Sequence, residues 1–407
     1  MKTVGVIAEF NPFHNGHGYF LREVREQSGA DYIVAVMSGD FVQRGTPAVF
    51  NKYIRTEMAL AGGADLVCEL PPAASCGSAE RFATGAISLL ESMGCIRELW
   101  FGSECGNADL LTRCAGLLLE EPEQFRTVLK EELKKGLTFP AARSKAAEEY
   151  LKDKKVSSIL SMPNNILGIE YIKALQKAGS FIRPCTLQRL GSAYSDTEVR
   201  EGSLPSAAAI RTQILTLPAT DYSSLKEWLP ARSFEVLHSR GKSCPPITEN
   251  DFSDMLIYRL LREDSDTLTS YLDINPDLAR RICNLRSQFL SFSTFADLVK
   301  TRNIARSAVN RALLHILLGI KSEEASALDK PSYIRILGFR RESSPLLTLL
   351  ADTSRVQLVT RTSDLEHNPA LRHTHTEHFA YDLYETIRAK KAGEAFLAEA
   401  SRPLVLL

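Results

Sequence analysis

The sequence predicts an α/β protein whose first part is a doubly wound parallel sheet and whose second part is mainly helical. Short apolar runs alternate with amphipathic helical patterns through the first half of the chain, which is typical of repeated βαβ units. Polar segments follow several of these runs, and from about residue 248 the pattern becomes helical. We expect one domain over residues 1–220, a connecting segment over 221–244 and a mainly helical domain over 245–407.

The composition is that of a soluble globular protein. The chain has 407 residues, 44% of them apolar and 24% charged, which is enough for two domains with cores of their own. It has no run of about 18 apolar residues and opens into a strand rather than a secretion signal, so we expect a cytoplasmic protein with no membrane partner. The eight cysteines form no Cys-x-x-Cys pair, which argues against a zinc knuckle or a disulfide framework.

The first βα unit carries the most informative segment of the chain. A buried strand is predicted around Val4–Ile7 and an amphipathic helix over Gly16–Gln27. Between them, turn dipeptides frame His14 and His17, and Gly16 stands where a side chain would block the close approach of a ligand. Because the first amides of a helix lack intrahelical partners, we expect a nucleotide phosphate at this helix start, beside two imidazoles.

Three further strands and three helices are predicted in alternation. They are the strands Tyr32–Met37, Asp65–Leu70 and Glu98–Phe101 and the helices Tyr53–Ala61, Ala79–Met93 and Leu110–Lys134. Ligands of such sheets bind at the carboxyl ends of the strands. Three loops should therefore converge on one crevice: His14–His17, Ser38–Gly45 and Gly102–Glu104.

A second polar cluster lies farther along the chain. Asn164 and Asn165 precede a helix through Tyr171–Ala178, so they can either cap it or bind a ligand. A strand over Ile182–Leu187 then leads to Arg189.

Ser206 opens one more helix, with Arg211 about a turn and a half inside it. Taken alone, this is an ordinary helix with a serine N-cap.

Two of these segments resemble the motifs of the nucleotidyltransferase superfamily. His14-Asn15-Gly16-His17 is similar to its His-x-Gly-His signature, and Ser206–Arg211 resembles its phosphate-binding Ser-Ser/Thr-x-x-Ile-Arg motif. The resemblance implies a Rossmann-like nucleotidyltransferase domain that forms an adenylate and releases pyrophosphate. Arg211 would then stabilise charge on the triphosphate, since a planar guanidinium suits phosphate oxygens.

Further segments narrow the resemblance, over nearly the whole chain, to the tRNA(Met) cytidine acetate ligase family. They are Glu9–His17, Gly39–Ala48, Phe101–Glu104, Pro163–Gly168 and Tyr333–Phe339. The resemblance implies that acetate attacks ATP to give acetyl-adenylate and pyrophosphate. The wobble cytidine of elongator tRNA(Met) then takes the acetyl group, which gives N4-acetylcytidine and AMP.

The resemblance also implies the residues that contact ATP, which we expect to be held with Mg²⁺ bound mostly by its phosphates. They are Ile7, Ala8, Glu9, Phe10, Asn11, Pro12, Phe13, His14, Asn15, Gly16, His17, Gly18, Tyr19, Phe20, Gly102, Asn164, Arg189 and Ser206.

Four residues are candidates for catalysis. His14, His17 and Arg211, as cations or hydrogen-bond donors, suit the neutralisation of charge on the leaving pyrophosphate. The cytosine amine must lose a proton as it attacks, so a carboxylate such as Asp40 or Glu104 is a candidate base. An alternative of equal weight is that Asp40 caps a turn and pairs with Arg44.

The helical part is expected to bind the tRNA. Between residues 300 and 344, nine basic residues face four acidic ones, with Tyr333 and Phe339 interleaved. The basic residues are Lys300, Arg302, Arg306, Arg311, Lys321, Lys330, Arg335, Arg340 and Arg341. Cations neutralise phosphate and an aromatic ring can stack on an unpaired base, although a solvated helix face would look the same.

A group of histidines near the end of the chain has spacings that could hold zinc. They are His367, His373, His375 and His378. Asn368-Pro369 beside them indicates a surface loop leading into a helix over Ala380–Ala392, and we expect no protein-bound metal.

Two rival functions remain open at this stage. A small-molecule adenylyltransferase would share the His-x-Gly-His site, although such enzymes rarely need a helical domain of this size. A non-catalytic RNA-binding protein would not need His14, His17 and Arg211.

Overall fold

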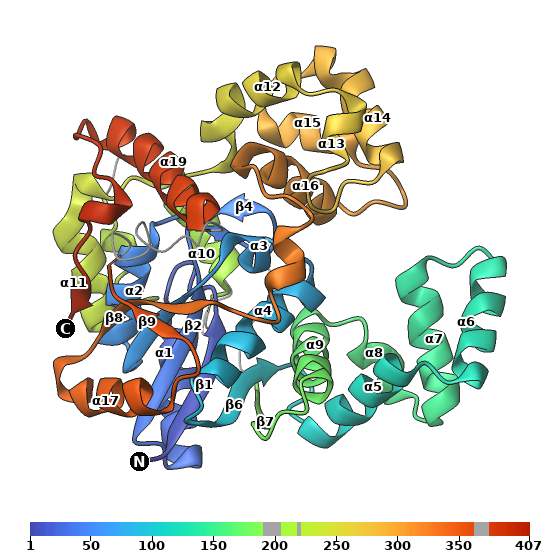
Figure 1. Cartoon of the computed structure of the whole chain (residues 1–407), viewed down its shortest axis with the longest axis horizontal. Coiled ribbons are helices and arrows are strands. Elements are labelled where there is room, and N and C mark those ends of the chain that lie inside the picture. Colours follow the sequence, from blue (N-terminus) through green and yellow to red (C-terminus); the bar gives the residue numbers. More distant parts are fainter. Residues whose placement is uncertain (190–204, 218–220, 362–373) are drawn as a thin grey trace.

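The computed structural model describes residues 1–189, 205–217, 221–361 and 374–407. Its centre is an eight-stranded sheet in the order β10-β8-β5-β2-β1-β6-β7, with β9 paired to β8 (Figure 1). The strands are β1 (Thr3–Ala8), β2 (Tyr32–Ser38), β5 (Leu66–Leu70), β6 (Ile96–Ser103), β7 (Arg183–Gln188), β8 (Tyr333–Phe339), β9 (Gln357–Val359) and β10 (Val405–Leu406). The predicted α/β class and parallel sheet are confirmed.

Helices cover both faces of the sheet, each over its own apolar core. One face carries α4 (Ala79–Ser92), α5 (Ala108–Glu120), α9 (Pro163–Lys177) and α17 (Ser344–Thr353). The other face carries α1 (Asn15–Ser28), α2 (Lys52–Ala61), α10 (Ala207–Thr216) and α11 (Ala231–Arg240). Strands such as β2, whose apolar side chains are buried on both sides, fit between two such layers.

One predicted helix is two helices in the structure. The expected Leu110–Lys134 is interrupted at Glu121, which has φ 43° and ends α5, and Pro122 then precedes α6 (Glu123–Lys134). Because proline has no N–H to donate to the preceding turn, the helix ends before Pro122. The apolar periodicity of the sequence nevertheless continues across this break, which is why one helix was predicted. α7 (Phe139–Leu151) and α8 (Lys155–Ile159) follow.

The helical part of the chain is shorter than predicted. α12 (Ser253–Arg262), α13 (Ser265–Leu268), α14 (Pro276–Leu285), α15 (Phe292–Val299) and α16 (Arg306–Leu318) share one core, and we call these helices the helical unit. The expected connecting segment 221–244 instead packs into the core beneath the sheet, through Leu225 and Leu237.

The end of the chain returns to the sheet rather than staying with the helical unit. β8 pairs antiparallel with β5, and β10 pairs parallel with β8. A domain boundary that gives all of 245–407 to the helical part is therefore wrong for these strands. α19 (Thr374–Ala392) begins earlier than the predicted Ala380.

The remaining elements are short. A hairpin of β3 (Phe41–Val42) and β4 (Thr46–Pro47) follows β2, and α3 (Pro72–Ser75) follows β5. Among the described residues, no helix combines the length and apolarity that crossing a membrane requires.

Candidate functional site

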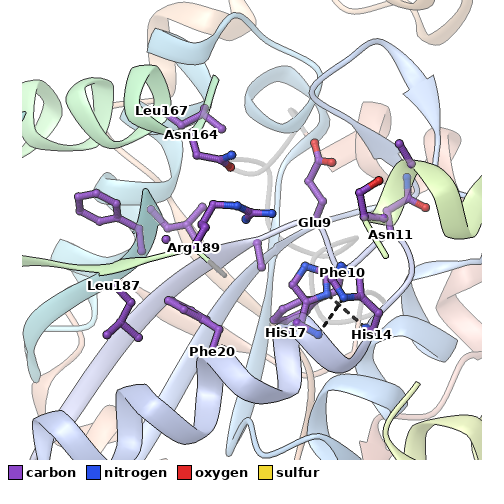
Figure 2. A pocket seen from close by; sticks show the side chains of 18 of the residues that line it. Glu9, Phe10, Asn11, His14, His17, Phe20, Asn164, Leu167, Leu187 and Arg189 are labelled. Carbon is purple, nitrogen blue, oxygen red and sulfur yellow. Dashed lines mark hydrogen bonds between the residues drawn. The ribbon is translucent and has the colours of Figure 1, made fainter. Parts of the chain in front are cut away.

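Two histidines stand at the start of α1, where the sequence placed them (Figure 2). His14 is the N-cap, and its Nδ1 accepts the Gly16 N–H at 3.0 Å; Nδ1 of His17 accepts the His14 N–H at 3.3 Å. The amides at this helix start already have acceptors within the protein, so binding of the predicted phosphate by free amides is not what the structure offers, and the phosphate beside the two imidazoles stays a prediction. The helix begins at Asn15, whose amide already donates to the Trp228 carbonyl at 2.9 Å.

These hydrogen bonds fix the tautomer of both rings. A ring nitrogen that accepts an N–H carries no proton, so neutral His14 and His17 carry theirs on Nε2. Burial, then the charges of Arg189 and Arg211, lowers the pKa of His14 to about 3. Burial, then His14 and Arg189, lowers the pKa of His17 well below its ordinary value. At neutral pH both imidazoles are therefore uncharged Nε2–H donors rather than cations.

A cavity opens beside these rings at the carboxyl ends of β1, β6 and β7. It is lined by both histidines, by Arg211 and by most residues expected to contact ATP. Those that line it are Ile7, Ala8, Glu9, Phe10, Asn11, His14, Gly16, His17, Tyr19, Phe20, Gly102, Asn164, Arg189 and Ser206. The fold thus brings together predicted segments that lie about 200 residues apart.

Four of the expected contact residues do not line the cavity: Pro12, Phe13, Asn15 and Gly18. Phe13 is fully buried, and its ring lies against the backbone at Gly62, where a Cβ would come within 2.2 Å of it. The segment Ile7–Phe20 is continuous in sequence, but successive side chains of a turn point in different directions. Some of them therefore pack in the core instead of lining the cavity.

Two arginines converge on the cavity from different elements. Arg211 of α10 donates from Nη1 to the Asn11 carbonyl at 2.7 Å. Arg189 follows β7, and its amide donates to the Ser103 carbonyl at 2.9 Å. A Cβ at Gly102 would lie 3.2 Å from Cγ of Arg189, so glycine lets this arginine cross the end of β6. Two guanidinium groups and two N–H donors together suit an oligophosphate.

Asn164 is held at the cavity by Glu104. One carboxylate oxygen of Glu104 accepts the amide N–H and the side-chain Nδ2 of Asn164, at 3.1 and 2.7 Å. Its other oxygen accepts the Asn165 N–H at 2.7 Å, while Oδ1 of Asn165 accepts the Glu104 N–H at 3.0 Å. Glu104 therefore caps α9 and does not line the cavity, which argues against it as the base.

The cavity also has an apolar wall, which was not predicted, although Phe101 and Leu167 of this wall lie in segments that resemble the family. Phe82, Phe101, Leu167, Tyr171 and Leu187 form this wall, next to Gln43, Gln188, Pro205, Ala207 and Ala208. Apolar residues on amphipathic helices and buried strands look like core residues, and only the topology reveals that these face a cavity. Such a wall suits the flat face of a nucleobase.

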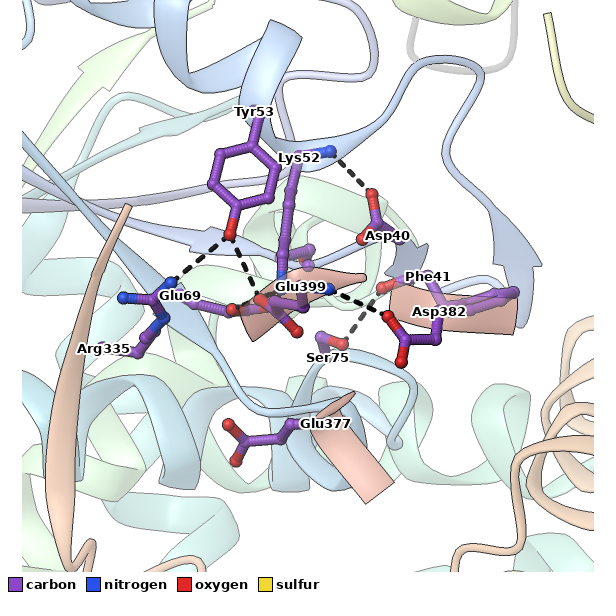
Figure 3. Close-up of polar contacts among 12 residues, drawn as sticks. Asp40, Phe41, Lys52, Tyr53, Glu69, Ser75, Arg335, Glu377, Asp382 and Glu399 are labelled. Carbon is purple, nitrogen blue, oxygen red and sulfur yellow. Dashed lines mark hydrogen bonds and ion pairs between the residues drawn. The ribbon is translucent and has the colours of Figure 1, made fainter. Parts of the chain in front are cut away.

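Asp40 does not line this cavity. It is 4% exposed, its Oδ1 accepts the Lys52 N–H at 2.6 Å, and its Oδ2 has no hydrogen-bond partner among the described residues (Figure 3). Burial raises the pKa of Asp40 to about 7, against the lowering effects of Lys52 and Arg55. A direct role as proton acceptor for a bound RNA base does not fit this position. The alternative that Asp40 accepts a backbone N–H agrees better with the structure, although the donor is the amide of Lys52.

Asp40 belongs to a buried charge cluster with Lys52, Glu69 and Glu399 (Figure 3). Arg55, which is also buried, interacts with Asp40 as well. Nζ of Lys52 lies 2.7 Å from Glu69 and 2.5 Å from Glu399. Burial alone would lower the pKa of Lys52, but Glu399 and Glu69 raise it well above its ordinary value.

Arg55 connects this cluster to the cavity. Its Nη1 donates to the carbonyls of Glu9 and Ser38, at 2.6 and 3.1 Å, and its Nη2 donates to the Gly39 carbonyl. Arg55, which lies outside the segments that resemble the family, thus holds the loop after β1 in place through the Glu9 carbonyl.

The predicted basic region is dispersed in the structure. Arg335 is 3% exposed in β8, and the hydroxyl of Tyr333 donates to Glu377. Arg340 is paired with Glu342. The prediction that Arg335 contacts RNA is therefore wrong, because its side chain is buried on one face of β8. RNA contact by the other basic residues and by Tyr333 and Phe339 stays a prediction.

The C-terminal histidines are only partly described. His367 and His373 lie outside the described residues, whereas His375 and His378 belong to α19. Within the described ranges, no three His, Cys, Asp or Glu residues are grouped in a way that could hold a metal ion.

Comparisons with known proteins agree on one family. The pattern of the HIGH nucleotidyl transferase family matches residues 1–396. A tRNA(Met) cytidine acetate ligase of Acetivibrio thermocellus is 38% identical, over 97% of this chain and 98% of its own. One of Caldicellulosiruptor saccharolyticus is 40% identical, over 89% and 87%.

Solved structures are similar along the whole chain. The apo crystal structure of Thermotoga maritima TmcAL has 32% sequence identity and a TM-score of 0.91, and each chain is covered completely. The same protein bound with alpha-thio ATP has a TM-score of 0.88 at the same identity and coverage.

Proposed function

Because the chain belongs to the tRNA(Met) cytidine acetate ligase family of HIGH nucleotidyl transferases, we propose that it uses ATP to join acetate to a cytidine of tRNA(Met). The observation that carries this proposal is the joint placement of His14, His17, Arg189 and Arg211 around one cavity. A relative of the same fold binds an ATP analogue, which supports ATP as the co-substrate.

In the first step, an acetate oxygen attacks the α-phosphorus of ATP, and the bond from that phosphorus to the bridging oxygen breaks. The products are acetyl-adenylate and pyrophosphate. The Nε2–H groups of His14 and His17 donate to phosphate oxygens, and the guanidinium groups of Arg189 and Arg211 offset the charge that grows on the leaving group. Acetate is already an anion, so catalysis here is alignment and charge stabilisation.

Mg²⁺ would accompany the nucleotide in this proposal. Glu9 is the one carboxylate among the described residues that line the cavity. Since the protein offers so few oxygen ligands there, the ion would be held mainly by the phosphates and would reduce their negative charge.

In the second step, the exocyclic amine of the cytidine, proposed to be the wobble base of the elongator tRNA, attacks the acetyl carbon. A C–N bond forms, the bond from carbon to the AMP oxygen breaks, and the amine loses a proton. Glu9 is better placed than Asp40 or Glu104 to accept it. One oxygen of Glu9 accepts the Gln43 N–H at 3.0 Å, and its side chain lies in the cavity (Figure 2).

The proposal is tested by incubating the protein with ATP, labelled acetate and unmodified tRNA(Met). We expect label in the RNA, as N4-acetylcytidine, with one AMP and one pyrophosphate formed per acetyl group. A tRNA in which the wobble cytidine is replaced by uridine is the matched control. Absence of label in the RNA, together with transfer of AMP to a phosphorylated small molecule, would favour the rival adenylyltransferase instead.

A further inference from the structure

A second cavity, of about 780 Å³, lies against the first and shares Gln43, Leu167 and Arg211 with it. Its other walls come from the β3–β4 hairpin, the first turns of α9 and α16, the end of α10 and the segment before α12. They include Arg44, Leu215, Ile247, Glu249, Arg306 and Ser307. The cavity therefore lies where the sheet domain meets the helical unit.

The two sides of this cavity are held together by specific contacts. Gly45, at φ +74° in the hairpin turn, lies so close to α16 that a Cβ there would come within 2.4 Å of the Arg311 nitrogen. Arg81 of α4 is paired with Asp273 of the helical unit. The buried ring of His315 lies 3.0 Å, through Nε2, from the Cys76 carbonyl. The cavity is thus a fixed part of the fold.

The walls of the cavity combine apolar surface with positive charge. Leu167, Leu215 and Ile247 offer apolar side chains. Three arginines, Arg44, Arg211 and Arg306, and one acid, Glu249, line it, and Arg306 is also paired with Asp297 outside the lining. Apolar faces suit a base that has left its stack, and an excess of arginine suits the phosphates of the same strand.

The volume of the cavity also distinguishes a nucleotide from acetate as its ligand. It falls in the range of about 300–1,000 Å³ that is typical of sites for drug-sized ligands, and is far larger than acetate needs. A nucleotide whose base enters here would meet the first cavity at Gln43 and Arg211, which border both. An amine at this border would face an acyl group bound in the first cavity, because the same residues line both.

We infer that this second cavity receives the unpaired cytidine nucleotide of the RNA substrate, with its base on the apolar wall and its phosphates toward the arginines. The inference rests on the proposed function and specifies where its second substrate binds. The acetyl transfer then takes place across the boundary between the two cavities.

The test separates RNA binding from turnover. Binding is measured by fluorescence anisotropy with a labelled anticodon stem-loop RNA that carries cytidine at the wobble position. Leu215, 51% exposed at the rim, is changed to glutamate so that folding is not threatened and the phosphates are repelled. Leu261, 65% exposed on α12 and outside the cavity, gives the matched control Leu261→Glu. Ser307→Trp fills the cavity from the α16 side.

We expect Leu215→Glu and Ser307→Trp to weaken RNA binding about tenfold or more, which corresponds to about 1.4 kcal/mol. Leu261→Glu should bind RNA as the wild type does, and all three variants should bind ATP normally. Unchanged RNA binding by both cavity variants, with ATP binding intact, overturns the inference whatever the activity. Wild-type protein that binds the RNA but transfers no acetyl group contradicts the proposed function and leaves the cavity assignment standing.

Discussion

The cavity around His14 and His17 and the charge cluster around Lys52 lie along the same edge of the same sheet, yet they have opposite character. Loops after β1, β6 and β7 leave the cavity open to a ligand. Behind the ends of β2 and β5, the equivalent space is closed by the end of the chain, which brings Glu399 onto Lys52. Polar residues therefore gather at the carboxyl ends of strands in both regions. Whether a substrate can reach them depends on which distant segments of the chain cover those ends.

The two regions also handle charge differently. Among the described residues that line it, the cavity has cations and neutral donors with a single carboxylate, Glu9, and so suits an anion. The cluster balances Lys52 against Glu69 and Glu399 within the protein. The cations of the first region can therefore bind a substrate anion, whereas Lys52 in the second region is already paired with Glu69 and Glu399.

The largest effect is expected from Lys52→Met in the cluster. Two carboxylates, Glu69 and Glu399, would stay buried without their cation, which should lower the free energy of unfolding by about 3–5 kcal/mol. Denaturant unfolding followed by circular dichroism measures this loss. ATP affinity of the folded fraction should be unchanged, since Lys52 does not line the cavity.

The control for this change is the triple variant Lys52→Met, Glu69→Gln, Glu399→Gln. It should recover most of the lost stability, because no unpaired charge is left inside. A single Lys52→Met variant as stable as the wild type would show that the cluster does not close this side of the fold.

The next effect is expected in the cavity, from His14→Asn. Asparagine is a favoured N-cap, so α1 keeps its start, but the Nε2–H donor is lost. We expect the rate of acetate-dependent pyrophosphate release to fall about 10²–10³-fold, as for removal of one donor to a developing charge, with little change in the thermal midpoint. His14→Ala should lose the same activity and, in addition, about 1 kcal/mol of stability. Full activity in His14→Asn would remove this imidazole from the chemistry.

The last effect concerns Asp40, which the sequence assigned to the first region and the structure to the second. Its pKa in the folded protein is about 7, above the ordinary value of 3.8, so the folded state binds more protons between these values. Wild-type stability should therefore fall as pH rises from about 4 to 7 through this group. Asp40→Asn removes the ionisable carboxyl group but keeps a side-chain oxygen that can accept the Lys52 N–H.

We accordingly expect the stability gained by Asp40→Asn over the wild type to rise from about 2 kcal/mol at pH 5 to about 4 kcal/mol at pH 8, measured by denaturant unfolding at several pH values. Acetyl transfer at pH 7.5 should be retained. A loss of about 10²-fold in transfer, with the fold intact, would return Asp40 to the list of catalytic groups.

Elements that depend on short-range patterns in the sequence were predicted well, whereas those that depend on distant partners were missed. The βα units up to β6 were placed within a few residues, because strand burial and helix periodicity are local patterns. The break at Pro122 was missed because the apolar repeat continues across it. The strand β8 was missed because its pairing partner, β5, lies more than 260 residues earlier.

By itself, the sequence determined the doubly wound core, the histidine pair at the start of α1 and the family to which the chain belongs, since each of these is written in short contiguous segments. Only the tertiary structure decided that both imidazoles are neutral Nε2–H donors, that Glu104 caps α9 and that Asp40 is sealed beneath Lys52. The histidine tautomers depend on short-range hydrogen bonds whose geometry forms only when the turn folds, and the neutrality of the rings depends on burial. The roles of Glu104 and Asp40 depend on partners farther along the chain, which leave no local pattern in the sequence.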